Sequence, residues 1–172
     1  MKMIKPILII ITLLFIVVVI FITISNKQHM VTIFEGNIAQ KPIKIILHHF
    51  QDSDCGMVID SIDYASQVVA PDGKTWFFHD HGGMIKWLEK KSFRDDAVIW
   101  VHSLDTKEWI DAREAHYTRN EHTPMEYGFG AYKKNRDGLI SFEEMRLLTL
   151  RGETMANPTI RRELLKDKNG NN

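Results

Sequence analysis

The sequence predicts an α+β fold, in which a small mixed domain follows one N-terminal transmembrane helix. A long apolar run opens the chain, segments rich in β-branched residues follow it, and apolar residues at helical spacing occur between such segments. Of the 172 residues, about 145 follow the apolar run, which is enough for one compact core.

The apolar run covers residues 7–24 and contains only two threonines among its hydrophobic residues. As a helix, its roughly 18 residues would rise about 27 Å, close to the thickness of a bilayer core. Lys2 and Lys5 precede the run, which predicts a cytoplasmic N-terminus and a periplasmic (extracytoplasmic) domain. A cleaved signal peptide is the alternative, but no small-residue cleavage pattern follows the run. We expect residues 1–26 to be a single-pass anchor in the cell membrane.

The charge of the exported part argues against nucleic-acid binding. Without Lys2 and Lys5, 20 basic residues stand against 22 acidic ones, so the net charge is near −2 with histidines neutral. A chain that binds nucleic acid usually carries a basic excess.

The domain, expected over residues 27–150, opens with strands and a hairpin. Residues 31–34 and 43–47 are rich in β-branched residues and predict two strands. Residues 61–70 and 74–78 flank the turn sequence Pro71-Asp72-Gly73 and predict a β-hairpin. Helical spacing follows at Met84, Ile85, Trp87 and Leu88, and residues 97–101 return as a strand.

A similar order recurs weakly, so the sequence predicts two small ββαβ-like units. Short strands are expected at 108–110, 115–117 and 128–132, and Ser141 is placed to cap a helix. Residues 151–172 are mostly polar and are expected to form a mobile C-terminal tail.

The single cysteine, Cys55, is the most informative residue for function. On the oxidising side of a membrane cysteines are normally paired, and this chain offers no second cysteine. Met57 lies two residues away, so in an extended segment both sulfur atoms point to the same side. A thiolate and a thioether are soft donors that suit Cu(I) and not Mg²⁺ or Ca²⁺.

Four segments form a set, namely Cys55-Gly56-Met57, Phe78-His79-Asp80, Trp109-Ile110-Asp111-Ala112 and Thr123-Pro124-Met125. Together they resemble the NosL family, the copper accessory proteins of nitrous oxide reductase. The resemblance covers roughly residues 50–135. It implies a fold of two small ββαβ units and a metallochaperone that is not an enzyme. It also implies Cu(I) bound by Cys55, Met57 and Met125. The implied partners are the reductase and an associated membrane transporter.

Other interpretations of the same residues stay open. A lone Cys or Met is often a core residue, which would leave a membrane-tethered interaction module without metal. Cys55 with His48 or His49 is a candidate activated thiolate of a thiol-dependent enzyme. The histidines, namely His48 and His49, His79 and His81, and His122 near Met125, are candidates for a Zn²⁺ or Cu(II) site.

A segment near the C-terminus resembles a calcium-binding EF-hand loop. With Gly138 at loop position six, Glu144 falls at position twelve, but Lys133 occupies position one, where a carboxylate is needed. We therefore expect a turn and a capped helix there, without Ca²⁺.

Overall fold

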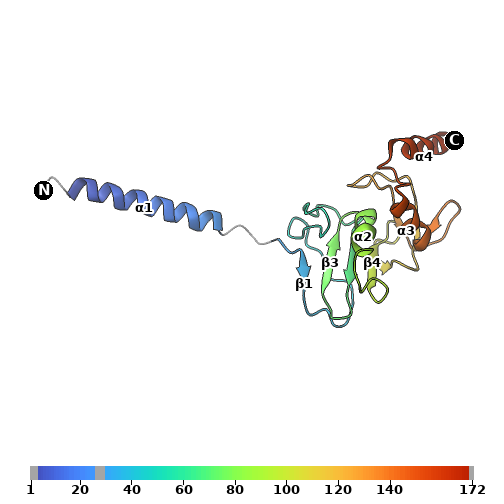
Figure 1. The fold of residues 1–172 in the computed structure, drawn as a ribbon, viewed down its shortest axis with the longest axis horizontal. Helices are drawn as coiled ribbons and strands as arrows, with labels where there is room; N and C mark the ends of the chain where they lie inside the picture. The colour runs from blue at the N-terminus through green and yellow to red at the C-terminus, as the bar shows by residue number, and fades with distance from the viewer. Residues whose placement is uncertain (1–3, 26–29, 171–172) are drawn as a thin grey trace.

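The computed structural model describes residues 4–25 and 30–170, and the side chains of residues 8–22 and 30–166. In these residues it contains four helices and two antiparallel sheets, which confirms a mixed α+β fold. Figure 1 shows helix α1 (Ile4–Ser25) set apart from the domain that carries both sheets.

Five strands form the larger sheet, in the order β1-β3-β2-β4-β5. Their bounds are β1 Ile33–Phe34, β2 Ser66–Val69, β3 Thr75–Phe78, β4 Val98–His102 and β5 Trp109–Asp111. The hairpin of β2 and β3 is confirmed, with Val69 opposite Thr75. Its turn ends at Gly73, whose φ of 81° favours glycine. Every residue of β2 is buried because the strand has a neighbour on each side.

Helix α2 (His81–Leu88) follows β3 directly and confirms the predicted helix. The Asp80 side chain caps its N-terminus by accepting a hydrogen bond from the backbone N–H of Gly82. Lys86 is the one exposed residue of the helix. The other positions pack on the sheet and on helix α3 (Phe142–Arg151), so α2 lies at the centre of the main core.

A smaller sheet and helix α3 complete the core. The sheet has the order β7-β6-β8, with bounds β6 His116–Tyr117, β7 Ala131–Tyr132 and β8 Ile140–Ser141. Ser141 caps α3 (Phe142–Arg151), as expected, by accepting a hydrogen bond from the backbone N–H of Glu144. The first predicted ββαβ unit is present as β2-β3-α2-β4. The second is not, since three short strands precede α3 and β5 joins the larger sheet.

One further prediction about secondary structure is wrong, and one helix was not predicted. Residues 43–47 form no strand, because the backbone of Ile43 pairs with the side-chain amide of Gln67 at 2.8 Å instead of with another strand. The polar tail, residues 151–172, contains helix α4 (Pro158–Gly170), which was not predicted, and Arg161 forms an ion pair of 2.7 Å with Glu126. Because this segment is rich in charged residues, the sequence did not predict the helix, which an ion pair connects to the domain.

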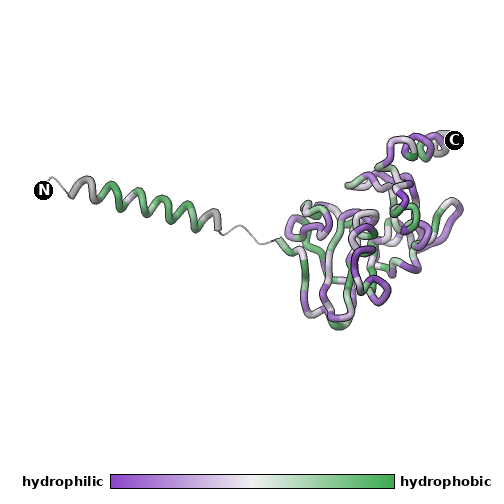
Figure 2. Tube along the Cα trace, viewed as in Figure 1, coloured by the Kyte–Doolittle hydropathy of each residue, from purple (hydrophilic) through white to green (hydrophobic). Residues whose placement is uncertain are grey.

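Helix α1 exposes apolar side chains, and Figure 2 shows it as an almost continuous hydrophobic helix. Its described side chains run from Leu8 to Ile22. Within the described part of the chain, no helix has both the length and the hydropathy to cross a bilayer. The structure therefore gives no support to the transmembrane anchor predicted for residues 1–26.

Candidate metal centre

The thiol lies in a tight loop, residues 52–57, beside the end of β3. Gln51 and Val58 form an isolated antiparallel bridge at its base. Inside the loop, the backbone N–H of Asp52 donates to the carbonyl of Met57 at 2.8 Å, and the N–H of Gly56 donates back to the carbonyl of Asp52 at 3.0 Å. Gly56 has a φ of 75°, a conformation that favours glycine. The sequence Cys-Gly-Met therefore closes a turn that presents the thiol.

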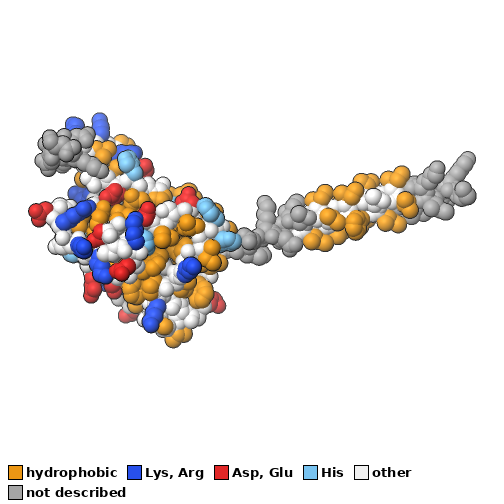
Figure 3. All heavy atoms as spheres, turned by 180° about the vertical axis from the view of Figure 1, so that it is seen from behind, with side chains coloured by type: hydrophobic (Ala, Val, Ile, Leu, Met, Phe, Trp, Pro, Cys, Tyr) orange, Lys and Arg blue, Asp and Glu red, His pale blue; other side chains and the backbone are white. Residues whose placement is uncertain are grey.

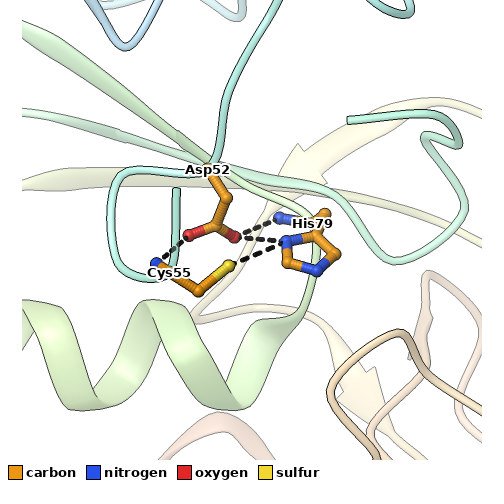
Figure 4. A group of neighbouring side chains, drawn as sticks. All are labelled: Asp52, Cys55 and His79. Atoms are coloured by element: carbon orange, nitrogen blue, oxygen red, sulfur yellow. Dashed lines mark hydrogen bonds and ion pairs between the residues drawn. The ribbon is translucent and has the colours of Figure 1, made fainter. Parts of the chain in front are cut away.

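The Asp52 carboxylate organises this loop and ties it to the end of β3. One oxygen, Oδ1, accepts from the backbone N–H groups of Asp54 at 2.7 Å and Cys55 at 3.0 Å. The other, Oδ2, accepts from the backbone N–H of His79 at 2.8 Å and lies 2.5 Å from Nδ1 of its ring. Figure 4 shows the contacts of Cys55 and His79 with this buried carboxylate.

Cys55 completes a group of three possible ligands. Its Sγ lies 3.9 Å from Nδ1 of His79, and one ligand atom from each of Asp52, Cys55 and His79 lies within 4.8 Å of the others. Asp52 and His79 are buried, while Cys55 is exposed. Typical zinc bonds are about 2.3 Å to sulfur and about 2.0 Å to nitrogen, so one ion can contact both atoms across 3.9 Å. The group is therefore able to hold a metal ion.

The electrostatics of the group favour a His79–Asp52 ion pair and a neutral thiol. Burial opposes the charge of Asp52, but the hydrogen bonds from His79 and from the loop outweigh it and lower the pKa of that carboxyl. Burial also opposes the charge of His79, yet the hydrogen bond and charge of Asp52 raise the pKa of its ring. Burial, together with the nearby charges of Asp52 and Asp54, raises the pKa of the Cys55 thiol. A metal must therefore displace a proton to bind this sulfur.

The geometry does not match a Cys-His-Asp catalytic triad. In such a triad the nucleophile and the carboxylate contact different nitrogens of the histidine ring. Here Asp52 and Cys55 both approach Nδ1 of His79, and Nε2 is buried without a hydrogen-bond partner in the described structure. The raised pKa of Cys55 also works against an activated thiolate.

A second loop approaches the same region through helix α2. Asp80 accepts from the backbone N–H of Met125 at 2.9 Å, and Tyr127 packs directly on Gly82. On its other side the helix start faces the thiol loop, since a Cβ atom added at Gly83 would lie 3.6 Å from the Asp54 carboxylate. The N-terminus of α2 thus separates the Met125 loop from the thiol loop.

The three ligands predicted from sequence lie in different surroundings in the structure. Cys55 belongs to the candidate group. Met57 closes the thiol loop through its carbonyl and exposes its side chain, while Met125 is partly buried against the main core. The ligand roles of these two methionines stay predictions. His48 and His122 are exposed, and neither belongs to the Asp52-Cys55-His79 group.

Sequence reasoning missed Asp52, and it considered His79 only as one histidine of a possible Zn²⁺ or Cu(II) site and did not join it to Cys55. Two signals were available, because Asp52 stands three residues before Cys55, where a carboxylate can accept turn N–H groups, and His79 directly follows the predicted strand 74–78. The sequence does not show the backbone pairing that brings these two segments together. The backbone N–H of Ser53 donates to the carbonyl of Phe77 at 2.8 Å, which fixes the loop beside β3.

Comparison with known proteins adds no assignment. The chain matches no protein-family model, and no curated protein is similar enough to count as a match.

Proposed function

We propose that this protein is a membrane-attached, extracytoplasmic Cu(I)-binding metallochaperone that serves the maturation of nitrous oxide reductase copper centres. The observation that carries the metal-binding part is the 3.9 Å approach of Cys55 Sγ to Nδ1 of His79 beside the Asp52 carboxylate. The resemblance of the sequence to the NosL family supports the choice of client and of an associated membrane transporter as partner.

Copper is proposed because of the sulfur donors. Cys55 supplies the thiolate, and Met57, two residues further on in the same loop, is the nearest thioether in sequence. Thiolate and thioether ligands select Cu(I), whereas Cys, His and Asp without a thioether also suit Zn²⁺. Met57 and Met125 are therefore the proposed discriminating ligands.

Transfer of the metal is proposed to occur by ligand exchange at the exposed sulfur. Cys55 opens onto a groove lined in part by Trp76, Trp87 and Lys91. An incoming thiolate or thioether from the recipient can approach Cys55 there and replace one protein donor at a time. His79, which is buried, would be the last donor to leave.

Membrane attachment is proposed through α1. Its side chains from Leu8 to Ile22 are exposed and almost all apolar, and burial of such side chains in lipid is favourable. Protease added to spheroplasts should digest the domain and leave a membrane-bound N-terminal fragment. A soluble chain after cell fractionation would contradict the attachment.

A binding role is proposed in preference to catalysis. The shared use of Nδ1 by Asp52 and Cys55 leaves no base positioned as in a thiol hydrolase. Turnover of a thiol-reactive ester, lost on Cys55→Ser, would favour the thiol-dependent enzyme instead.

The metal assignment is tested by loading the full chain in detergent with Cu(I) under anaerobic conditions and with Zn²⁺ in a separate sample. X-ray absorption on the Cu(I) sample should show sulfur and nitrogen donors. Met57→Leu and Met125→Leu should weaken Cu(I) binding and leave Zn²⁺ binding unchanged, with the core methionine variant Met84→Leu as control. Absence of binding for both metals would favour the interaction module.

The client is tested in a host that reduces nitrous oxide. Deletion of the protein should leave the reductase exported and folded but short of copper when copper is limiting. Full copper occupancy of the purified reductase would exclude it as the client.

A further inference from the structure

The outer surface beside the thiol loop is apolar where a solvated surface is normally polar. Ile45 and Ile59 are buried in the smaller core, with Phe50 and Phe77, while their chain neighbours Ile46 and Val58 are exposed. In half-buried extended segments the outward positions usually carry polar residues.

Three exposed aliphatic side chains form this surface, which we call the apolar patch. They are Ile46, Leu47 and Val58, with exposed fractions from 39% to 55%. Backbone contacts hold their segments together. The N–H of His48 donates to the carbonyl of Ile59 at 3.0 Å, and Gln51 bridges Val58.

The exposed apolar residues of the domain are concentrated in the N-terminal part of its sequence. Outside α1, nine large hydrophobic side chains are exposed in the described structure, and seven of them lie between residues 33 and 58. Leu147 and Leu150 are the other two. Figure 3 shows hydrophobic side chains across the middle of the domain and toward the side on which α1 lies.

The short connection between the patch and α1 indicates what kind of surface covers the patch. Val31 forms an isolated β-bridge with Phe50, a residue of the smaller core. It lies six residues after Ser25, the C-terminal end of α1. Six residues reach at most about 21 Å. The patch is thus tied closely to a helix whose own side chains are apolar and exposed, so a lipid surface that holds α1 also lies within reach of the patch.

We propose that the apolar patch rests on the lipid surface to which α1 attaches. The inference depends on the membrane attachment proposed above and adds an orientation to it. Cys55 lies in the loop between Gln51 and Val58, at the border of the patch. The docked domain therefore holds its thiol close to the membrane, where a membrane protein can reach it and a partner far from the bilayer cannot.

The lone cysteine makes the test specific. A nitroxide attached to Cys55 of the full chain, bound to phosphatidylcholine vesicles, reports its depth through relaxation by oxygen and by a water-soluble nickel complex. The label should lie at the lipid headgroups. Leu47→Asp with Val58→Asp should move it into water, while α1 keeps the chain on the vesicles. Leu147→Asp with Leu150→Asp is the matched control and should leave the depth unchanged.

Three outcomes would overturn the docking. They are a wild-type label exposed to water, equal shifts in the patch and control variants, and spin–spin broadening that places a second copy on the patch. Circular dichroism checks that each variant is folded. Cu(I) binding by unlabelled wild-type protein in detergent is measured separately, so a failure of metal binding is distinguished from a failure of docking.

Discussion

Nδ1 of His79 lies 2.5 Å from Oδ2 of Asp52, and the same nitrogen is the one that faces the Cys55 thiol. Asp52 and an incoming metal ion therefore compete for the same ring nitrogen. A metal that binds Nδ1 must break or stretch this contact and remove the proton that it shares. The carboxylate then remains beside the ion, held in place by the backbone N–H groups of Asp54 and Cys55.

Asp52→Asn tests this role of the carboxylate. The amide keeps the shape but loses the charge, and one side of it turns a donor toward N–H groups that need an acceptor. We expect Cu(I) affinity to fall by about 10- to 100-fold, as for partners that orient a metal ligand, and stability to fall by about 1–3 kcal/mol. Competition with a Cu(I) chelator and urea unfolding measure the two effects. Asp54→Asn, an exposed neighbour, is the control, and an equal loss there would contradict the prediction.

Metal affinity should rise with pH across the neutral range. The raised pKa of Cys55 keeps its thiol protonated near neutrality, and the raised pKa of His79 keeps its ring protonated to a higher pH than usual. These protons must be lost when metal binds. Titrations at several pH values should give a positive slope that flattens above the pKa of the thiol. A pH-independent affinity would exclude Cys55 and His79 as ligands.

The ion pair should also shape stability in the metal-free protein. The raised pKa of His79 means that its contribution is complete below the unfolded value of about 6.5 and is lost as pH rises through the folded value. The lowered pKa of Asp52 means that its contribution is present above about 3.9 and is lost as pH falls through the folded value. Unfolding free energies of wild type and His79→Gln should thus differ most between these limits. A constant difference from pH 3 to 9 would argue against the pair.

Gly82→Ala should destabilise the protein and disturb the Met125 loop. Its Cβ would lie 2.1 Å from Cγ of Tyr127, well inside contact distance, and overpacking of this kind costs about 1–3 kcal/mol. Gly83→Ala is the control in the same helix, since its Cβ meets only the Asp54 carboxylate at 3.6 Å. Thermal unfolding should separate the two variants, and equal midpoints would show that the loop yields at little cost.

Calcium should not stabilise the protein. Lys133, at the first position of the EF-hand-like loop, forms an ion pair of 2.8 Å with Glu108, and Ser141 caps α3. A cation at this position opposes a second cation. Unfolding midpoints with excess Ca²⁺ and with a chelator should coincide, and a higher midpoint with Ca²⁺ would contradict this account.

Local patterns predicted the parts of the fold that depend on neighbours in the chain. The Pro71-Asp72-Gly73 hairpin, the helix around Met84 and the Ser141 cap are all confirmed. Predictions that depended on distant partners were less successful. Residues 43–47 look like a strand, but the Gln67 side chain takes the backbone hydrogen bonds of Ile43.

The same difference between local patterns and distant partners explains which residues of the candidate site could be predicted from sequence. Cys55 could be chosen from sequence because it is the single thiol. Asp52 and His79 could not be joined to it, since 27 positions separate them and their contact arises from pairing of the loop with β3. The chemistry of one residue is readable in a sequence, whereas the shared nitrogen of His79 is a property of the fold.

Anaerobic competition of the full chain with a chromogenic Cu(I) chelator tests the central claim most directly. Wild-type protein should take one Cu(I) from the chelator. Cys55→Ser should lose this binding because it removes the thiolate, and His79→Ala should weaken it by at least about tenfold. The exposed histidine variant His122→Ala should match wild type. Equal Cu(I) affinity in wild type and Cys55→Ser would contradict the claim that this loop is the copper site.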